Sequence, residues 1–141
     1  MLERLAVVLL LVLMTVGMSL VVRRRARVRT AAAEGLPLPD ALRSRPPADA
    51  AGILYFFGPH CGSCRQQAAI LDQLGRRERV TVLKLDAVEK AELADAFGIA
   101  TVPATVVVAP GGTVQTINLG LRSLPVLAGQ LRQAKDARAA A

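Results

Sequence analysis

The only two cysteines of the chain lie three positions apart, as Cys61 and Cys64, directly after an apolar run from Gly52 to Phe57. An uninterrupted apolar run of that length is typical of a strand covered on both faces, and the residues after it are expected to begin a helix. At a helix N-terminus the unpaired N–H groups favour a thiolate over a thiol, which activates the sulfur as a nucleophile. The spacing puts the second sulfur one turn along the same helical face. The pattern therefore predicts a redox dithiol in which Cys64 attacks a mixed disulfide formed on Cys61.

Half of a zinc site is the main competing interpretation of two cysteines in this spacing. A closed zinc site takes four nitrogen or sulfur ligands, whereas the chain adds only one histidine, His60, whose place beside Cys61 does not suit such a site. A c-type haem site requires histidine after the second cysteine, where the chain has Arg65. Redox chemistry is thus favoured. A module that handles Cu(I) through Cys61, Cys64 and His60 is kept as an alternative, because soft thiolates select that ion.

A second pattern lies downstream, where Phe97-Gly98-Ile99 precedes Val102-Pro103 and another apolar run. Together with the cysteine pair, it makes residues 52–138 resemble the thioredoxin family from its active-site strand to its last helix. The resemblance implies an α/β fold with the element order βαβαββα, in which helices flank a mixed sheet. It also implies that a redox-active disulfide between Cys61 and Cys64 exchanges with cysteine-containing protein substrates and with an upstream dithiol donor or acceptor, without a metal or another cofactor.

The same resemblance implies a cis peptide bond between Val102 and Pro103. In the family this proline faces the cysteine pair, and the residue before it offers its backbone to the substrate chain. A bond before proline is the one type for which the cis form costs only about 0.5 to 1 kcal/mol. An ordinary trans proline that opens a strand is the alternative, because a proline at the first position of a strand removes no ladder hydrogen bond.

The resemblance assigns roles by position. Cys61 is the nucleophile and Cys64 the resolving thiol. Pro59 is expected to fix the loop that enters the helix. His60 stands where the family commonly has tryptophan, and its protonated ring would favour the Cys61 thiolate. The alternative for His60 is a solvated loop residue.

Three positions depart from the family pattern or lose a partner. Tyr55 falls where thioredoxin has a buried aspartate that is proposed to relay the proton of the resolving cysteine. Lys84 matches a family lysine, but without that carboxylate it is expected to extend into solvent. Between the cysteines, Gly62 is followed by Ser63 in place of the usual proline. The serine hydroxyl either donates to the thiolate or simply starts the helix.

The N-terminal part of the chain carries an uncharged aliphatic run from Leu5 to Val22. As a helix it would be about 27 Å long, close to the hydrocarbon thickness of a bilayer. A cleaved signal peptide is the competing interpretation, and Ala31-Ala32-Ala33 would supply small residues for cleavage. The arginine-rich block at 23–29 intervenes, however, and such a block acts as a stop-transfer signal. We therefore expect residues 1–29 to form a transmembrane anchor with a basic juxtamembrane block.

The same block bears on the orientation in the membrane. Lysine and arginine within about 15 to 20 residues of a span tend to remain cytoplasmic. Before the span only Arg4 and the terminal amine are positive, beside Glu3. A single-pass protein of the cell membrane with its domain on the cytoplasmic face is therefore expected. The extracytoplasmic face is the alternative, because many membrane-tethered relatives of thioredoxin work there.

Between anchor and domain, residues 30–49 contain four prolines and no periodic apolar pattern, so they are expected to form a linker, with a short helix near Pro39 to Leu42. The domain is expected over residues 50–141, trimmed of the strand and helix that precede the active-site strand in a full thioredoxin. Its further predicted elements begin with a helix from Cys61 to about Arg76, for which Gly75 is available as a stop, and a strand from Val80 to Leu85. A helix from about Val88 to Phe97, capped by Asp86 and stopped by Gly98, is expected next. Strands from Ala104 to Ala109 and Thr113 to Leu119 follow, and then a helix from Ser123 with Val126, Leu127 and Leu131 inward.

The net charge of +7 does not indicate nucleic-acid binding. Residues 48–141 carry ten basic and eight acidic side chains, a balance of only +2, so the excess lies beside the predicted span, where arginines are attracted to anionic head groups. Three phenylalanines and one tyrosine supply no platform on which bases could stack. A redox-silent docking domain is a further alternative, against which the presence of both cysteines and Pro103 argues.

Overall fold

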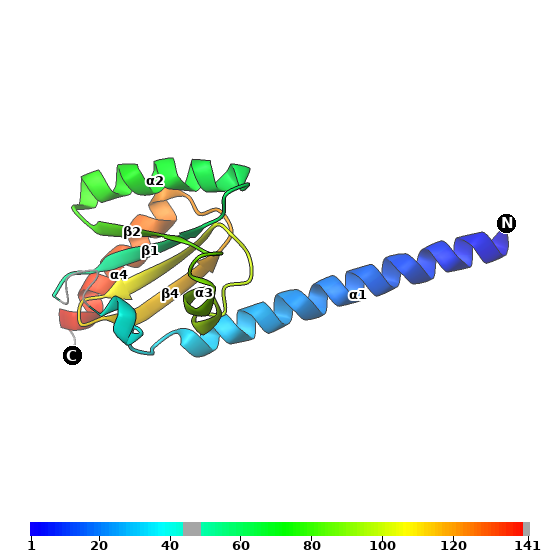
Figure 1. Ribbon diagram of the computed structural model, residues 1–141, viewed down its shortest axis with the longest axis horizontal. Coiled ribbons are helices and arrows are strands. Elements are labelled where there is room, and N and C mark those ends of the chain that lie inside the picture. Colours follow the sequence, from blue (N-terminus) through cyan, green and yellow to red (C-terminus); the bar gives the residue numbers. More distant parts are fainter. Residues whose placement is uncertain (44–48, 140–141) are drawn as a thin grey trace.

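The computed structural model describes residues 1–43 and 49–139, and it consists of one long helix that leads into a small α/β domain (Figure 1). The sheet has the strand order β2-β1-β3-β4; β1 runs parallel to β2 and antiparallel to β3, and β3 is antiparallel to β4. The elements are α1 (Leu2–Ala33), a 3₁₀ turn η1 (Asp40–Leu42), β1 (Gly52–Phe57), α2 (Gly62–Glu78), β2 (Thr81–Asp86), α3 (Ala91–Ala96), β3 (Ala104–Ala109), β4 (Thr113–Leu119) and α4 (Leu124–Ala139). The predicted α/β order βαβαββα after an N-terminal helix is confirmed.

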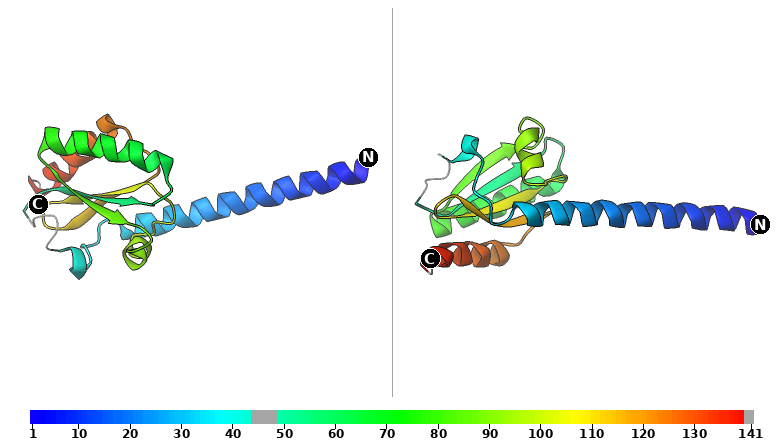
Figure 2. Two further views of the ribbon diagram at one scale, coloured as in Figure 1. Left: turned by 45° about the horizontal axis from the view of Figure 1, so that its top comes forward. Right: turned by 90° about the horizontal axis from the view of Figure 1, so that it is seen from below.

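The central strand β1 is buried on both faces, as its apolar run predicts. Alternate side chains point to opposite faces of a strand, so β1 contributes to two core clusters. Ile53 and Tyr55 pack with residues of α2 and α4, whereas Leu54 and Phe56 pack with residues of α3, η1 and the end of α1. Figure 2 shows α3 and α4 on opposite sides of the sheet.

The three antiparallel-paired strands β1, β3 and β4 begin and end at the predicted residues, and β2 is displaced by one. Gly75, the expected stop, does not end α2. The helix continues to Glu78, and Arg79 takes the left-handed conformation with φ of 50°. Gly75 instead allows a close approach to β2, because a Cβ there would lie 3.5 Å from the Val80 carbonyl oxygen.

The two later helices also differ from their predicted bounds. The Asp86 carboxylate accepts hydrogen bonds from the N–H groups of Val88 and Glu89, so it closes a turn, and α3 starts only at Ala91. Gly98, with φ of +66°, follows α3 as expected. In α4, Leu127 and Leu131 are buried as predicted, but Val126 is 45% exposed and faces away from the sheet.

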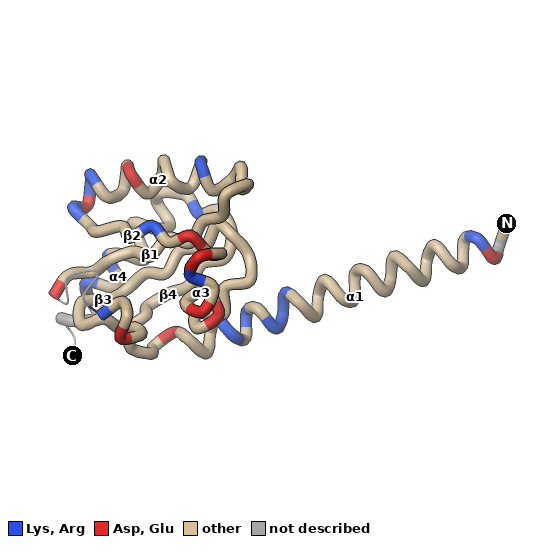
Figure 3. Tube along the Cα trace, in the orientation of Figure 1, with Lys and Arg blue, Asp and Glu red and all other residues tan. Residues whose placement is uncertain are grey.

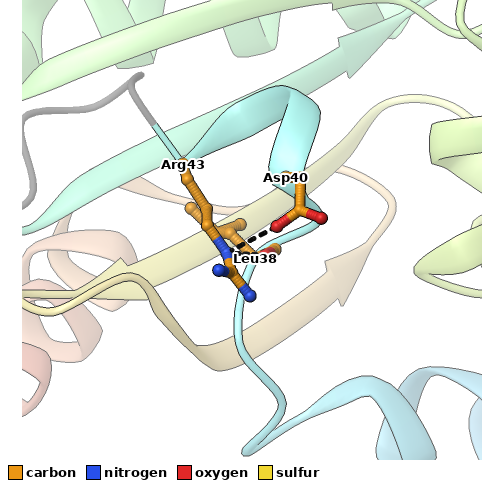
Figure 4. Close-up of polar contacts among 3 residues, drawn as sticks. All are labelled: Leu38, Asp40 and Arg43. Carbon is orange, nitrogen blue, oxygen red and sulfur yellow. Dashed lines mark hydrogen bonds and ion pairs between the residues drawn. The ribbon is translucent and has the colours of Figure 1, made fainter.

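The predicted linker at 30–49 does not hang free over its described part. Leu38 and Leu42 are buried in the core cluster beneath β1, and Pro37 forms a bridge with Thr113 at the start of β4. The predicted short helix is present as η1, where Arg43 binds Asp40 at 3.0 Å and donates to the Leu38 carbonyl at 3.3 Å (Figure 4). Two linker prolines, at positions 46 and 47, lie outside the described residues. Apolar side chains at irregular spacing explain the difference, since they are buried without helical or strand periodicity.

Helix α1 is unbroken from Leu2 through the arginine block to Ala33. Between Glu3 and Ala33 it is long and apolar enough to cross a membrane, a property that N-terminal signal sequences share. Figure 3 shows an uncharged stretch of α1 bounded by charged residues at both ends. Within residues 1–43 and 49–51 no strand precedes β1.

Candidate active site

The cysteine pair lies where β1 passes into α2. Cys61 is the N-cap residue of α2, and its sulfur accepts a hydrogen bond from the Cys64 N–H at 3.2 Å. The two cysteines are joined by a disulfide. The partial positive charge at the first turn of a helix therefore falls on the sulfur of Cys61. This is the local geometry that the strand-to-helix pattern predicts.

The two sulfurs differ in their surroundings. Cys61 is partly exposed, whereas Cys64 is only 4% exposed and belongs to the core cluster between the sheet and its two covering helices. Ser63 places its hydroxyl oxygen 3.5 Å from the Cys61 sulfur. Because neither sulfur of a disulfide carries a proton, the serine is the donor in this contact. An incoming group thus reaches Cys61 before Cys64.

A cavity of about 640 Å³ opens beside the disulfide. Both cysteines border it, and so do the loop residues Pro59 and His60 and the helix residue Gly62. His60 is exposed, which is compatible with either of its two expected roles. The remaining residues that line the cavity are Tyr55, Phe57, Gly58, Arg65, Ala68 and Lys84.

Tyr55 fills the position of the family's buried acid with a neutral group. The residue is 2% exposed, and its hydroxyl donates a hydrogen bond of 2.6 Å to the Cys64 carbonyl. Burial raises the pKa of Tyr55 above its ordinary value of 10.0, because an apolar environment disfavours the phenolate. The phenol therefore holds the first turn of α2 and does not serve as a base near neutral pH.

Lys84 has a partner that the sequence analysis did not identify. Its ammonium group lies 3.0 Å from a carboxylate oxygen of Asp72 on α2, and both side chains are about half exposed (47%). Lys84 thus extends partly into solvent, and it also pairs with a carboxylate other than the family's acid. A pair exposed to this extent contributes about 0 to 1 kcal/mol to stability, so it mainly positions the lysine at the rim of the cavity.

The loop before β3 contains the predicted cis peptide bond, between Val102 and Pro103. Val102 lies close to the active-site loop, since a Cβ on Gly58 would be 3.1 Å from its side chain. The buried Pro103 is held by its carbonyl, which accepts a hydrogen bond from the Gly120 N–H at 2.8 Å. Neither residue lines the cavity. The structure thus joins this loop to the cysteine loop through Gly58.

Gln67 is a residue near the site that the sequence analysis missed. It is fully buried, and its amide forms two hydrogen bonds with the backbone of Arg122: Nε2 donates to the carbonyl at 3.3 Å, and Oε1 accepts from the N–H at 2.7 Å. The spacing Cys64, Gln67, Leu71 and Leu74 places it on the apolar stripe of α2. A glutamine within an otherwise apolar stripe of a helix is the sequence pattern that could have indicated this buried contact.

Among the described residues no group of three or more histidine, cysteine, aspartate or glutamate side chains is placed to hold a metal ion. The Cu(I) alternative therefore gains no further ligand from the part of the chain that the structure describes.

Comparison with known proteins agrees with this geometry. The profile of a family described as "TraF: F plasmid transfer operon protein", whose fold is thioredoxin-like, matches residues 44–131. The chain belongs to this thioredoxin-like family. Thioredoxin of Bacillus subtilis is 30% identical over 63 residues, which are 43% of this chain and 61% of that protein. Thioredoxin 1 of Synechococcus elongatus is 30% identical over 67 residues, 46% of this chain and 63% of the relative.

A solved structure of chloroplastic thioredoxin z superimposes with a TM-score of 0.58 and 26% identity, over 68% of this chain and 85% of that one. The thioredoxin-like chain spans about three-fifths of the length of the curated relatives it matches. Their similarity, together with the disulfide across Cys61 and Cys64, supports a thiol-disulfide oxidoreductase.

Proposed function

We propose that this thioredoxin-like protein is a membrane-anchored oxidoreductase that exchanges disulfides with cysteines of other proteins through Cys61 and Cys64. The observation that carries the proposal is the asymmetry of the pair at the start of α2. Cys61 caps the helix and is partly exposed, whereas Cys64 is buried behind it. An exposed thiolate next to a buried thiol is the arrangement that a two-step exchange requires.

In the reduced form, the Cys61 thiolate attacks one sulfur of a substrate disulfide, forms a mixed disulfide and releases the other substrate sulfur as a thiolate. Cys64 then loses its proton and attacks the Cys61 sulfur, which releases the second substrate thiolate. Two electrons pass to the substrate, and the Cys61–Cys64 disulfide is formed. The reverse sequence oxidises a substrate dithiol, and an upstream dithiol or disulfide restores the starting form.

The neighbouring residues support these steps in distinct ways. Water in the cavity that Cys64 borders takes its proton, because Tyr55 occupies the place of the family's acid and is held neutral by burial. Ser63 donates to the Cys61 sulfur. Val102 offers its backbone to the substrate chain, beside the cysteine loop that it contacts through Gly58. Lys84 adds positive charge near the cavity, and His60 lies at the border of the cavity.

The role of each cysteine is tested by alkylation. Cys64→Ser leaves only the thiol at position 61, and Cys61→Ser leaves only the thiol at position 64. We expect the thiol at position 61 to react faster and to have a pKa below the free-cysteine value of about 8.5. Rates are measured across pH with a small alkylating agent. The Cys64→Ser variant is also expected to accumulate mixed disulfides with substrates, whereas Cys61→Ser is not. Faster labelling of Cys64 at every pH would refute the assignment.

The anchor is the second part of the proposal. The uncharged run of α1 spans the bilayer, and the five arginines that follow it keep the domain on the cytoplasmic face by the positive-inside rule. Cysteines of proteins on that side are then the substrates. The extracytoplasmic face is the competing location, and protease digestion of sealed vesicles of known sidedness distinguishes the two.

A further inference from the structure

Helix α1 is packed against the domain and does not simply end beside it. Thr30 and Ala33 in its last turns are buried, at 7% and 5% exposure. The contact with Gly98 is so close that a Cβ at that position would lie 2.6 Å from the Arg29 Cβ. Just after the helix, the Glu34 carboxylate accepts a hydrogen bond of 2.9 Å from the N–H of Ile117 on β4. These contacts fix the direction of α1 relative to the sheet.

Beside this contact, a small cleft reaches along α1 to the end of its uncharged run. Val22, Arg25 and Arg29 line this cleft together with Gly98 and Ala100 of the loop that follows α3. Val22 is the last residue of the run that is predicted to lie in the bilayer, and the arginine block starts next to it. With the run in the hydrocarbon core, the arginines lie among the head groups. The loop at Ala100 then lies at the membrane surface.

That loop leads directly to the active site. Two residues after Ala100 comes Val102, which lies against Gly58, and Gly58 is three residues before Cys61. Figure 1 shows the same relation at the scale of the domain: the N-terminal end of α2 lies on the side toward which α1 extends, and the C-terminal end of α2 lies on the far side. The rotated view on the left of Figure 2 agrees.

From this geometry we infer that the Cys61–Cys64 site faces the membrane surface, and that its partner is a cysteine pair held there by an integral membrane protein. The inference rests on the proposed exchange function and anchor. A soluble globular substrate would have to enter the space between the site and the head groups. A cysteine pair at the end of a transmembrane helix already lies at the membrane surface, next to the site.

The exchange is balanced between the two proteins. One partner disulfide and the Cys61/Cys64 dithiol become one partner dithiol and the Cys61–Cys64 disulfide, or the reverse. Two electrons and two protons move in each turnover, and no further reactant takes part. The structure does not need to bend at the helix–domain junction for this contact to occur.

The distance of the site from the membrane surface is measured by fluorescence quenching in vesicles. The full chain is reconstituted in phosphatidylcholine and phosphatidylglycerol that carries a nitroxide on some head groups. A thiol-reactive fluorophore is placed either on Cys61, in the Cys64→Ser variant, or on the other end of α2, in a variant with Arg77→Cys and both native cysteines replaced by serine. Arg77 is exposed and lies about 24 Å along the helix from Cys61.

We expect the fluorophore on Cys61 to be quenched several-fold more strongly than the one at position 77. Equal quenching, or stronger quenching at position 77, would overturn the inference. In the same vesicles, the reduced wild type should react with a water-soluble chromogenic disulfide. If that reaction fails, the proposed exchange function is wrong, whereas the quenching contrast still reports the orientation of the site.

The partner class is tested with two transmembrane peptides that carry the same cysteine pair. In one the pair directly follows the apolar span, and in the other a helical spacer of about 20 residues holds it about 30 Å from the span. Exchange is followed by the redox state of Cys61 and Cys64. We expect the first peptide to exchange at least several-fold faster. Equal rates, or faster exchange with the distant pair, would show that the site does not select a partner at the surface.

Discussion

At the scale of single residues, the substitution of the family's buried acid by Tyr55 makes a measurable prediction. Tyr55→Phe keeps the ring, which lies 5.9 Å from that of Phe57, and removes only the hydroxyl that donates to the Cys64 carbonyl. We expect the free energy of unfolding to fall by about 1 kcal/mol near neutral pH, the usual net contribution of a buried hydrogen bond. Urea unfolding of the oxidised protein measures it. An unchanged midpoint would show that the hydrogen bond contributes nothing.

The same residue gives a defined pH dependence. Burial raises the Tyr55 pKa above 10.0, so the unfolded state loses this proton before the folded state does. The contribution of the neutral phenol to the free energy of unfolding is fully present below about pH 10. It is lost as the pH rises from there through the raised pKa of Tyr55. In the Tyr55→Phe variant, the free energy of unfolding should not show this decrease above about pH 10. Because the chain has one tyrosine and no tryptophan, tyrosinate absorbance reports Tyr55 alone.

At the scale of elements, α2 is fixed to the loop after β4 by the buried Gln67. Gln67→Ala leaves the Arg122 N–H without its 2.7 Å hydrogen bond, and an unpaired buried polar group costs about 1 to 3 kcal/mol. We expect a loss of stability of that size. Gln66→Ala is the matched control, because Gln66 is exposed on the same helix. Equal effects of the two variants on the denaturation midpoint would argue against the contact.

The same helix shows which parts of the fold the sequence could predict. The strands and the start of α2 follow from apolar runs and from the cysteine spacing, so they are predicted nearly to the residue. The Gln67 contact joins positions 55 residues apart, and no local pattern encodes that distance. The Lys84–Asp72 pair likewise depends on how β2 lies beside α2. Both contacts depend on how the elements are arranged in the tertiary structure, and not on local secondary-structure propensity.

At the scale of the whole molecule, the arginines at positions 23, 24, 25, 27 and 29 are expected to set the orientation in the membrane. Their replacement by glutamine should weaken or reverse the preference for a cytoplasmic domain, because the positive-inside rule then loses its charges. Protease digestion of sealed vesicles of known sidedness measures the location. If the wild-type domain is protected in vesicles whose cytoplasmic face points outward, the domain is extracytoplasmic and the charge argument is wrong for this chain.

The junction between α1 and the domain was not predictable from local sequence, because Ala33, Leu38 and Leu42 are buried at irregular intervals among prolines and small residues. These side chains pack the end of α1 and the segment after it against the domain, and this packing has a specific test. Ala33→Arg places a charge at a site that is 5% exposed, which costs several kcal/mol unless the helix separates from the domain. Ala32→Arg, on the exposed neighbouring position, is the control.

We expect Ala33→Arg to abolish the difference in lipid quenching between fluorophores on Cys61 and at position 77, while Ala32→Arg preserves it. Both variants should still react with a soluble chromogenic disulfide, since position 33 lies outside the cavity at the cysteine pair. That reaction shows that the domain is folded. A loss of the difference in quenching then reports that the domain has separated from α1. A contrast that persists in Ala33→Arg would mean that the contacts of Ala33 do not hold the active site toward the membrane.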